Sequence, residues 1–320
     1  MLTHRTVADD LNGTNHAMRL YSFQMDGRPG TGAEFSGALV DLRAGYEAMR
    51  AARGSSAGSP RSLPADMLSL LSLGAPGFEA VRDTLAFARR RPALPVGQRL
   101  LYSLDEATLL APVPRPGKII LGFPAEYALS RNLSIPSSAP WVAKLPNTVV
   151  GTQRPIIAPR HSSSLTFASG VAAIVGQILK YGSIEDAMGA ICGFTLLNHI
   201  SAPTGSSDPF RTANFDTFCP MGPCLVTRDE FGKPNELEIR CKVNGKAGWI
   251  GTLEAPVATL ARLLQDVSHV MTLEPGDIVA LILGPPTNGD AVRIQGGDAV
   301  LLDATPLGCL QNTVQFNRLV

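Results

Sequence analysis

Proline and glycine interrupt this chain so often that long helices have little room to form. The 320 residues include 25 prolines and 31 glycines, spread along the whole length. Proline blocks a helix interior because it lacks a backbone donor, and glycine favours turns. Short strands joined by turns tolerate such interruptions, so the sequence predicts a fold rich in β-structure.

The first part of the chain combines strand-like and helix-like patterns. Residues 18–23, Met-Arg-Leu-Tyr-Ser-Phe, alternate as a strand does, and Asp26-Gly27 follows as a turn signal. Residues 45–53, 66–73 and 78–91 have helical spacing of apolar side chains. We therefore expect a flexible leader over residues 1–17 and a small mixed domain over residues 18–109.

A proline-rich run marks the junction to a second part. Residues 111–117, Ala-Pro-Val-Pro-Arg-Pro-Gly, cannot form a regular helix or a central strand. Beyond it, strand and turn patterns dominate, with helices expected near residues 183–192 and 256–270. Asn244-Gly245 between two β-rich runs predicts a tight hairpin turn. The predicted fold class is α+β, with residues 110–320 as the larger and mainly β domain.

Charge, hydropathy and cysteine spacing exclude several classes of partner. The formal net charge is +1, so we expect no nucleic acid and no charged membrane surface as a partner. No apolar run reaches the ~18 residues of a membrane span, and the N-terminal segment lacks the apolar block of a signal peptide. The five cysteines show neither a zinc-knuckle nor a disulfide spacing. We expect a cytoplasmic protein with reduced thiols.

A set of segments in fixed order resembles the fumarylacetoacetate hydrolase family of C–C bond hydrolases, decarboxylases, isomerases and hydratases. The similar segments are residues 18–23 with 40–42, 112–120, 144–151, 215–223, 243–245, 272–277, 297–298 and 308–314. The resemblance spans nearly the whole chain. It implies a small N-terminal domain, a catalytic domain built as a mixed β-roll or β-sandwich, and a homodimer.

The resemblance also implies a magnesium or manganese site, but its ligand positions have changed. The family has an Asp-x-Glu-x-Glu strand and a later Asn-Asp pair, which together supply three carboxylates. The matching positions hold Thr166, Ala168, Gly170 and the pair Asn198-His199. Hard divalent cations need oxygen ligands, and a zinc ion on His199 and Cys192 alone would have too few ligands. We therefore expect no metal ion and no other cofactor.

The acid–base groups that the resemblance implies are missing as well. By spacing, the family's lid histidine and glutamate fall on Ala128 and Arg131, which leaves Glu126 and Tyr127 as ionisable neighbours. The positions of a later arginine and lysine hold Pro203 and Ala213. A turn that binds substrate carboxylates in the family aligns with residues 281–284.

Two catalytic candidates remain at family positions. His199 is the candidate general base, and the alternative is a hydrogen-bonded structural histidine. Lys144 is the candidate anchor for an enolate or carboxylate oxygen, and the alternative is a solvated or salt-bridged lysine. The candidates for substrate contact are Glu126, Tyr127, Thr166, Ala168, Gly170, Asn198, Arg211 and Leu283.

Three functions are compatible with these changes. The first is a metal-independent enzyme that acts on a β-dicarbonyl, keto acid or polyketide-like small molecule by C–C cleavage, decarboxylation, isomerisation or cyclisation. The second is a pseudoenzyme that serves as a binding or assembly subunit. The third is a conventional metal-dependent member with an unusual ligand set. We also expect a homodimer, as the resemblance implies.

Overall fold

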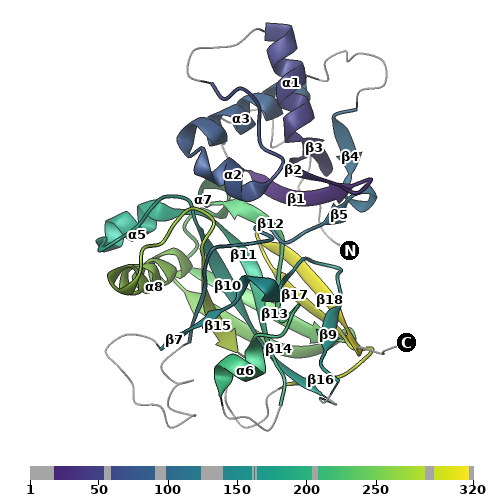
Figure 1. The fold of residues 1–320 in the computed structure, drawn as a ribbon, viewed down its shortest axis with the longest axis vertical. Helices are drawn as coiled ribbons and strands as arrows, with labels where there is room; N and C mark the ends of the chain where they lie inside the picture. Colours follow the sequence, from purple (N-terminus) through teal and green to yellow (C-terminus); the bar gives the residue numbers. More distant parts are fainter. Residues whose placement is uncertain are drawn as a thin grey trace.

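The protein folds as two β-sheets with helices at one end and along one flank (Figure 1). A computed structural model describes residues 18–53, 59–90, 99–123, 140–160, 162, 164–203, 208–284 and 292–316. The mixture of sheets and helices confirms the α+β fold class. Glu126 and Tyr127 lie outside the described residues.

The larger sheet has 13 strands, and its main path runs β4-β3-β2-β1-β12-β11-β10-β15-β6-β7. Its strands are β1 (Arg19–Met25), β2 (Arg28–Phe35), β3 (Ala38–Asp41), β4 (Leu101–Ser103), β5 (Thr108–Leu109), β6 (Ile119–Gly122), β7 (Trp141–Lys144), β8 (Val149–Val150), β10 (Leu165–Val175), β11 (Ile191–Ser201), β12 (Cys219–Thr227), β15 (Ile278–Gly284) and β16 (Arg293–Ile294). Strand β1 pairs directly with β12, with Leu20 opposite Leu225. The sheet therefore runs across the predicted junction near residue 110, and that domain boundary stays a prediction.

The smaller sheet has five strands in the order β14-β13-β17-β18-β9. They are β9 (Ile156–Ala158), β13 (Glu236–Val243), β14 (Lys246–Glu254), β17 (Ala299–Ala304) and β18 (Gly308–Phe316). Asn244 and Gly245 connect β13 to β14 with φ angles of 52° and 75°. Both angles are positive, as a type I′ turn requires, so the hairpin prediction is confirmed.

Several helices begin at a residue whose side chain caps the first turn, or at a proline in the first turn. They are α1 (Leu42–Arg53), α2 (Met67–Ser72), α3 (Ala75–Arg89), α5 (Ile184–Ala190), α6 (Pro209–Ala213), α7 (Arg228–Phe231) and α8 (Pro256–Val270), with the 3₁₀ turns η2 (Leu104–Glu106) and η3 (Pro146–Thr148). Ser183 and Asp186 form a reciprocal capping box on α5, and Asp66 accepts a hydrogen bond from the Ser69 amide on α2. The predicted helices are thus confirmed, with small shifts at their ends.

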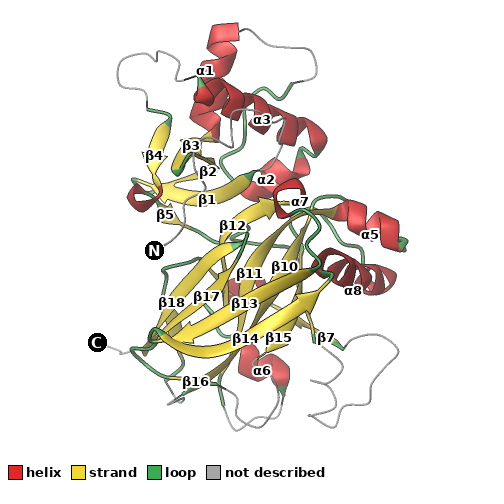
Figure 2. Ribbon diagram, turned by 180° about the vertical axis from the view of Figure 1, so that it is seen from behind, coloured by secondary structure: helices red, strands yellow, loops and turns green. Residues whose placement is uncertain are grey.

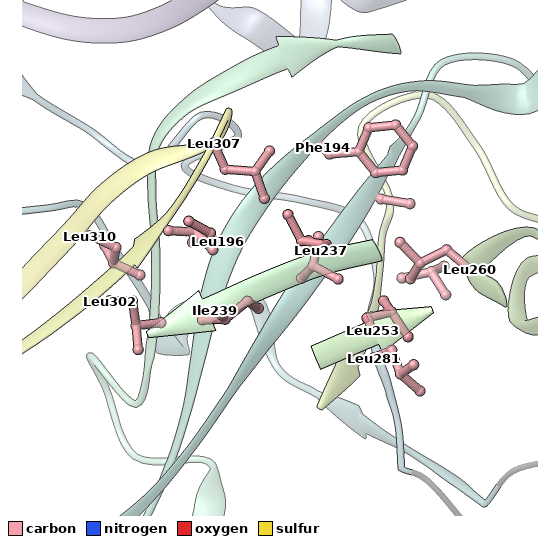
Figure 3. Packing of buried hydrophobic residues seen from close by; sticks show 14 of the residues in the cluster. Phe194, Leu196, Leu237, Ile239, Leu253, Leu260, Leu281, Leu302, Leu307 and Leu310 are labelled. Atoms are coloured by element: carbon pink, nitrogen blue, oxygen red, sulfur yellow. The ribbon is translucent and has the colours of Figure 1, made fainter. Parts of the chain in front are cut away.

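Two apolar cores hold the sheets in place. One lies between the two sheets, where Leu196 of β11 packs with Ile239 of β13 and Leu310 of β18 (Figure 3). The strands of the smaller sheet cross those of the larger sheet over this core (Figure 2). The other core lies on the opposite face of the large sheet and includes Ala168, Ala172 and the apolar sides of α1–α3. The two faces of β10 and β11 are therefore in different environments.

Within the described part of the chain, no helix combines the length and apolar character that a membrane span requires. All five cysteines are free thiols, as their spacing predicts.

Candidate functional site

The candidate site forms on one face of the paired strands β10 and β11. Their register places Ala168 opposite His199, Thr166 opposite Ser201 and Gly170 opposite Leu197. Alternate residues of a strand point to opposite faces, so Thr166, Ala168 and Gly170 share a face with His199. The hydroxyl groups of Thr166 and Ser201 are 2.8 Å apart across this pair. The structure thus brings four of the predicted site residues together.

Gly170 allows strand β15 to approach β10 unusually closely. A Cβ at this position would overlap the Leu281 carbonyl oxygen and would lie 2.9 Å from the Cα of Ile282. The register of β10 against β15 shifts between Ser169 and Gly170, and this irregularity accompanies the close approach. A side chain at residue 170 therefore requires a movement of the β15 backbone.

Lys144 reaches this face because the chain crosses back over the sheet after β7. In the sheet order, β10, β15 and β6 separate β7 from β11. The chain leaves β7 at Lys144 and soon pairs with β12 as the parallel strand β8, with Val149 beside Cys219. This crossing carries Lys144 back towards β11, although the two strands are not neighbours in the sheet.

The Lys144 amine is buried and bound by carbonyl groups and one imidazole. The residue is 3% exposed. Its Nζ donates to the Ala213 carbonyl at 2.5 Å and approaches the Ile200 carbonyl at 3.5 Å and His199 Nδ1 at 3.4 Å. No acidic side chain of the described residues forms an ion pair with it. The alternative of a solvated or salt-bridged lysine is therefore wrong for the described part of the structure.

Burial controls the charge of this amine. Loss of water around Nζ lowers the pKa of Lys144 from its ordinary 10.5 to about 8. Cys219 is the ionisable neighbour that acts in the opposite direction. Burial raises the pKa of the Cys219 thiol to about 11, so this thiol is neutral near pH 7 and offers little countercharge. Charged and neutral forms of Lys144 are thus both accessible near physiological pH.

The protonation state of Lys144 decides what His199 can do. A charged ammonium can only donate, so Nδ1 of a neutral His199 then accepts and Nε2 carries the ring proton. A neutral Lys144 can instead accept from Nδ1–H, and Nε2 is then the unprotonated nitrogen of the ring. His199 also packs edge-on against Phe123, with ring centroids 5.9 Å apart. The imidazole is therefore oriented by a ring on one side and an amine on another.

Two of the predicted substrate contacts lie elsewhere, and a third is exposed on a helix beside the site. The Asn198 side chain is fully buried on the opposite face of β11, where its Oδ1 accepts a hydrogen bond from the Ser169 hydroxyl. Leu283 packs against the core between the sheets. Arg211 is exposed on α6, a short helix that packs against β7 and β11. Strand periodicity explains the first two cases, because neighbouring residues on one strand cannot share a face.

The structure adds residues that the sequence did not single out. Phe123 contacts His199, and the Ala213 carbonyl binds Lys144. The Asn214 side chain accepts a hydrogen bond from the Leu145 amide at 2.7 Å, and Asn147 donates to Asp216 at 2.7 Å. These bonds fix the segment after β7 to the loop after α6. No local sequence pattern signals them, because they join segments about seventy residues apart.

The residues on this face do not suit the divalent metal ion that the sequence resemblance implies. Thr166, Ala168 and Gly170 bring no carboxylate, and any side chain at residue 170 meets the β15 backbone. Nowhere in the described ranges do three or more His, Cys, Asp or Glu side chains group as metal ligands. A magnesium or manganese ion therefore lacks its usual anionic ligands here.

Replacing Lys144 by methionine should reveal the cost of burying the amine. Because the folded-state pKa is lowered, the unfolded chain holds this proton between pH 8 and 10.5 after the folded protein has released it. Wild-type stability should therefore rise through that window relative to Lys144→Met. Between pH 8 and pH 10.5, the free energy of unfolding of the wild type should rise by about 3 kcal/mol more than that of the variant. Urea unfolding at several pH values measures it.

The pH dependence separates this effect from the lost hydrogen bonds, which Lys144→Met removes at every pH. Lys246 on β14 is exposed, so its side chain stays in water in both states. Lys246→Met is the matched control and should show no comparable pH-dependent difference. A flat difference between Lys144→Met and wild type would contradict the burial of a titrating amine.

Comparison with known proteins identifies the family. Residues 125–315 match the family described as fumarylacetoacetate (FAA) hydrolase C-terminal. The mitochondrial oxaloacetate tautomerase FAHD2A of Bos taurus is 32% identical over 264 residues, which cover 79% of this chain and 81% of that protein. A 2,4-didehydro-3-deoxy-L-rhamnonate hydrolase from Sphingomonas sp. (strain SKA58) is 29% identical over 63% of this chain and 75% of that protein.

Solved structures show the same fold. The fumarylacetoacetate hydrolase of Exiguobacterium antarcticum matches with a TM-score of 0.69 at 22% identity, over 94% of this chain and 100% of that one. A maleylpyruvate hydrolase from Sphingobium sp. SYK-6, solved with manganese(II) and pyruvate, matches with a TM-score of 0.69 at 21% identity and the same coverage. The matched domain and the similarity along most of the chain agree with the ordered segments in the sequence, and the chain belongs to the fumarylacetoacetate hydrolase family.

Proposed function

We propose that this protein is a metal-independent enzyme that moves a proton at the carbon next to the carbonyl group of a keto acid. The observation that carries the proposal is the contact between His199 and a buried Lys144, which forms no ion pair with a described residue, on the strand face where the family's carboxylates would stand. The pair combines a cationic or nucleophilic amine with a group that exchanges protons near neutral pH.

Keto–enol interconversion is the reaction that requires the fewest catalytic groups at such a site. It needs a group that withdraws electrons from the carbonyl and a group that carries the proton. Lys144 would serve the carbonyl and His199 the proton. Curated relatives of similar length include oxaloacetate tautomerases, which supports a keto acid as the substrate class. Hydrolysis of a C–C bond would also require an activated water molecule, for which the described residues offer no further base beside His199.

Hydrogen exchange tests the proposal together with metal dependence. Oxaloacetate in deuterated water should exchange its hydrogens beside the keto group faster with the protein than in buffer, as measured by nuclear magnetic resonance. The rate should survive EDTA, and elemental analysis should find no stoichiometric metal ion. Loss of exchange on chelation and its return with magnesium or manganese would instead support a metal-dependent member with an unusual ligand set.

Absence of accelerated exchange in the wild type would favour the pseudoenzyme alternative. The homodimer and the cytoplasmic location stay predictions. The curated relatives include mitochondrial proteins, so the compartment in particular needs its own measurement.

A further inference from the structure

We propose that the Lys144 amine condenses with the keto group of the substrate, so that an imine replaces the metal ion as the electron-withdrawing group. This inference rests on the proposed function, because it specifies how the carbonyl group is activated in that reaction. It assigns Lys144 a covalent role that a purely electrostatic anchor would not have.

The contacts of Nζ fit an amine prepared for addition. A neutral amine has two N–H donors and one lone pair. The carbonyl oxygens of Ala213 and Ile200 lie 2.5 and 3.5 Å from Nζ and can accept both donors. The remaining direction faces His199 Nδ1 at 3.4 Å. The lone pair therefore points at the imidazole, so His199, the more exposed member of the pair, must turn aside before a keto carbon can reach Nζ.

The surroundings also supply the neutral amine that addition requires. The described residues place no carboxylate beside Nζ, and burial lowers the pKa of Lys144 to about 8. A carboxylate partner would hold the amine in its charged and unreactive form. Lysines that form imines are activated by such removal from water.

An electrostatic anchor would conflict with the proposed role of His199. A charged Lys144 donates to Nδ1, so Nε2 then holds the ring proton and cannot act as a base. With a neutral Lys144, Nε2 can be the unprotonated ring nitrogen, but the amine then gives no positive charge to the carbonyl. A protonated imine resolves this conflict, because its nitrogen is positive and keeps one hydrogen. That hydrogen can stay with the Ala213 carbonyl and need not be donated to Nδ1.

The steps balance without an added oxidant or reductant. The lone pair of Nζ forms a C–N bond to the keto carbon, and one amine proton moves to the oxygen. A proton taken up from solvent lets the hydroxyl group leave as water, which breaks the C–O bond and leaves a positively charged C=N–H group; the same proton returns to solvent when the imine is hydrolysed. His199 then takes a proton from the adjacent carbon, so the electron pair moves into the enamine. Return of a proton and addition of water release the carbonyl product and restore Lys144.

Reductive trapping tests the inference directly. Wild-type protein is incubated with oxaloacetate or pyruvate in the presence of sodium cyanoborohydride and examined by intact-mass and peptide mass spectrometry. The expected result is one adduct per chain on Lys144, formed faster as the pH rises through about 8. Adducts only on exposed lysines such as Lys246 would overturn the inference.

Oxygen exchange provides a second measurement that needs no reductant. Formation and hydrolysis of the imine replace the keto oxygen by one from solvent, so the wild type should accelerate uptake of ¹⁸O from labelled water. Lys144→Arg keeps a positive charge but cannot form an imine, and this acceleration should be lost in it. Circular dichroism and thermal unfolding check that the variant is folded.

The combined results separate this inference from the proposed function. Accelerated deuterium exchange without a Lys144 adduct and without accelerated ¹⁸O uptake overturns the imine and leaves the proposed function standing. Full deuterium exchange in a folded Lys144→Arg variant does the same. No accelerated exchange of deuterium or oxygen with either keto acid overturns both.

Discussion

Gly170→Ala should lower the free energy of unfolding by about 3 kcal/mol or more, because the new methyl group overlaps backbone rather than a movable side chain. The added Cβ would collide with the Leu281 carbonyl oxygen and lie 2.8 Å from its carbon. Relief requires β15 to move away from β10, which breaks part of the ladder between these central strands. Urea unfolding followed by circular dichroism measures the change.

Gly189→Ala is the matched control for this substitution. Gly189 lies on α5, and a Cβ there meets no atom within 4 Å. Alanine is the better helix former, so this variant should gain about 0.5–1 kcal/mol. Equal stability of Gly170→Ala and wild type would show that β15 does not approach β10 as closely as described.

The Gly170 result also bears on the chemistry of the site. Residue 170 stands at one of the family's carboxylate positions, as the sequence resemblance implies. A glutamate there would begin with the same misplaced Cβ, so restoring the family's ligands would require a different β10–β15 register. The missing carboxylate at residue 170 therefore reflects the close approach of the β15 backbone as well as a change of side chain.

Local patterns predicted the parts of the fold that depend on neighbouring residues. The Asn244-Gly245 hairpin and the helix from residue 256 to 270 follow from turn chemistry and apolar periodicity, and both are present. The pairing of β1 with β12 was not visible, because it joins residues about two hundred positions apart. Sequence separation, rather than weak side-chain preferences, limited the prediction of the sheet.

The same limit explains the candidate site. The sequence resemblance assigned His199 and Ala168 to one place, and the strands that carry them pair along their length with these two residues opposite each other. Strand periodicity sends Asn198 to the other face, which the sequence resemblance alone did not reveal. The approach of Lys144 to His199 depends on the crossing from β7 to β8, a feature of topology that no motif encodes.

His199→Ala should slow exchange of the hydrogens beside the keto group of oxaloacetate by about 10²–10⁴-fold, the range expected for a positioned acid–base group. The imidazole lies 3.4 Å from the Lys144 amine and is held edge-on by Phe123. Alanine removes the proton carrier and leaves the Lys144 contacts to the Ala213 and Ile200 carbonyls in place. Deuterium exchange followed by nuclear magnetic resonance gives the rate.

His269→Ala is the matched control, because His269 is an exposed histidine at the end of α8 whose ring lies 6.2 Å from that of Tyr181. It should exchange at the wild-type rate. Thermal unfolding of both variants separates loss of proton transfer from loss of structure. A folded His199→Ala protein with wild-type exchange would show that another group carries the proton, and His199 would then be the hydrogen-bonded structural histidine. A slow variant that still forms the borohydride-trapped adduct on Lys144 would instead place His199 after carbon–nitrogen bond formation, at the step that moves the proton on carbon.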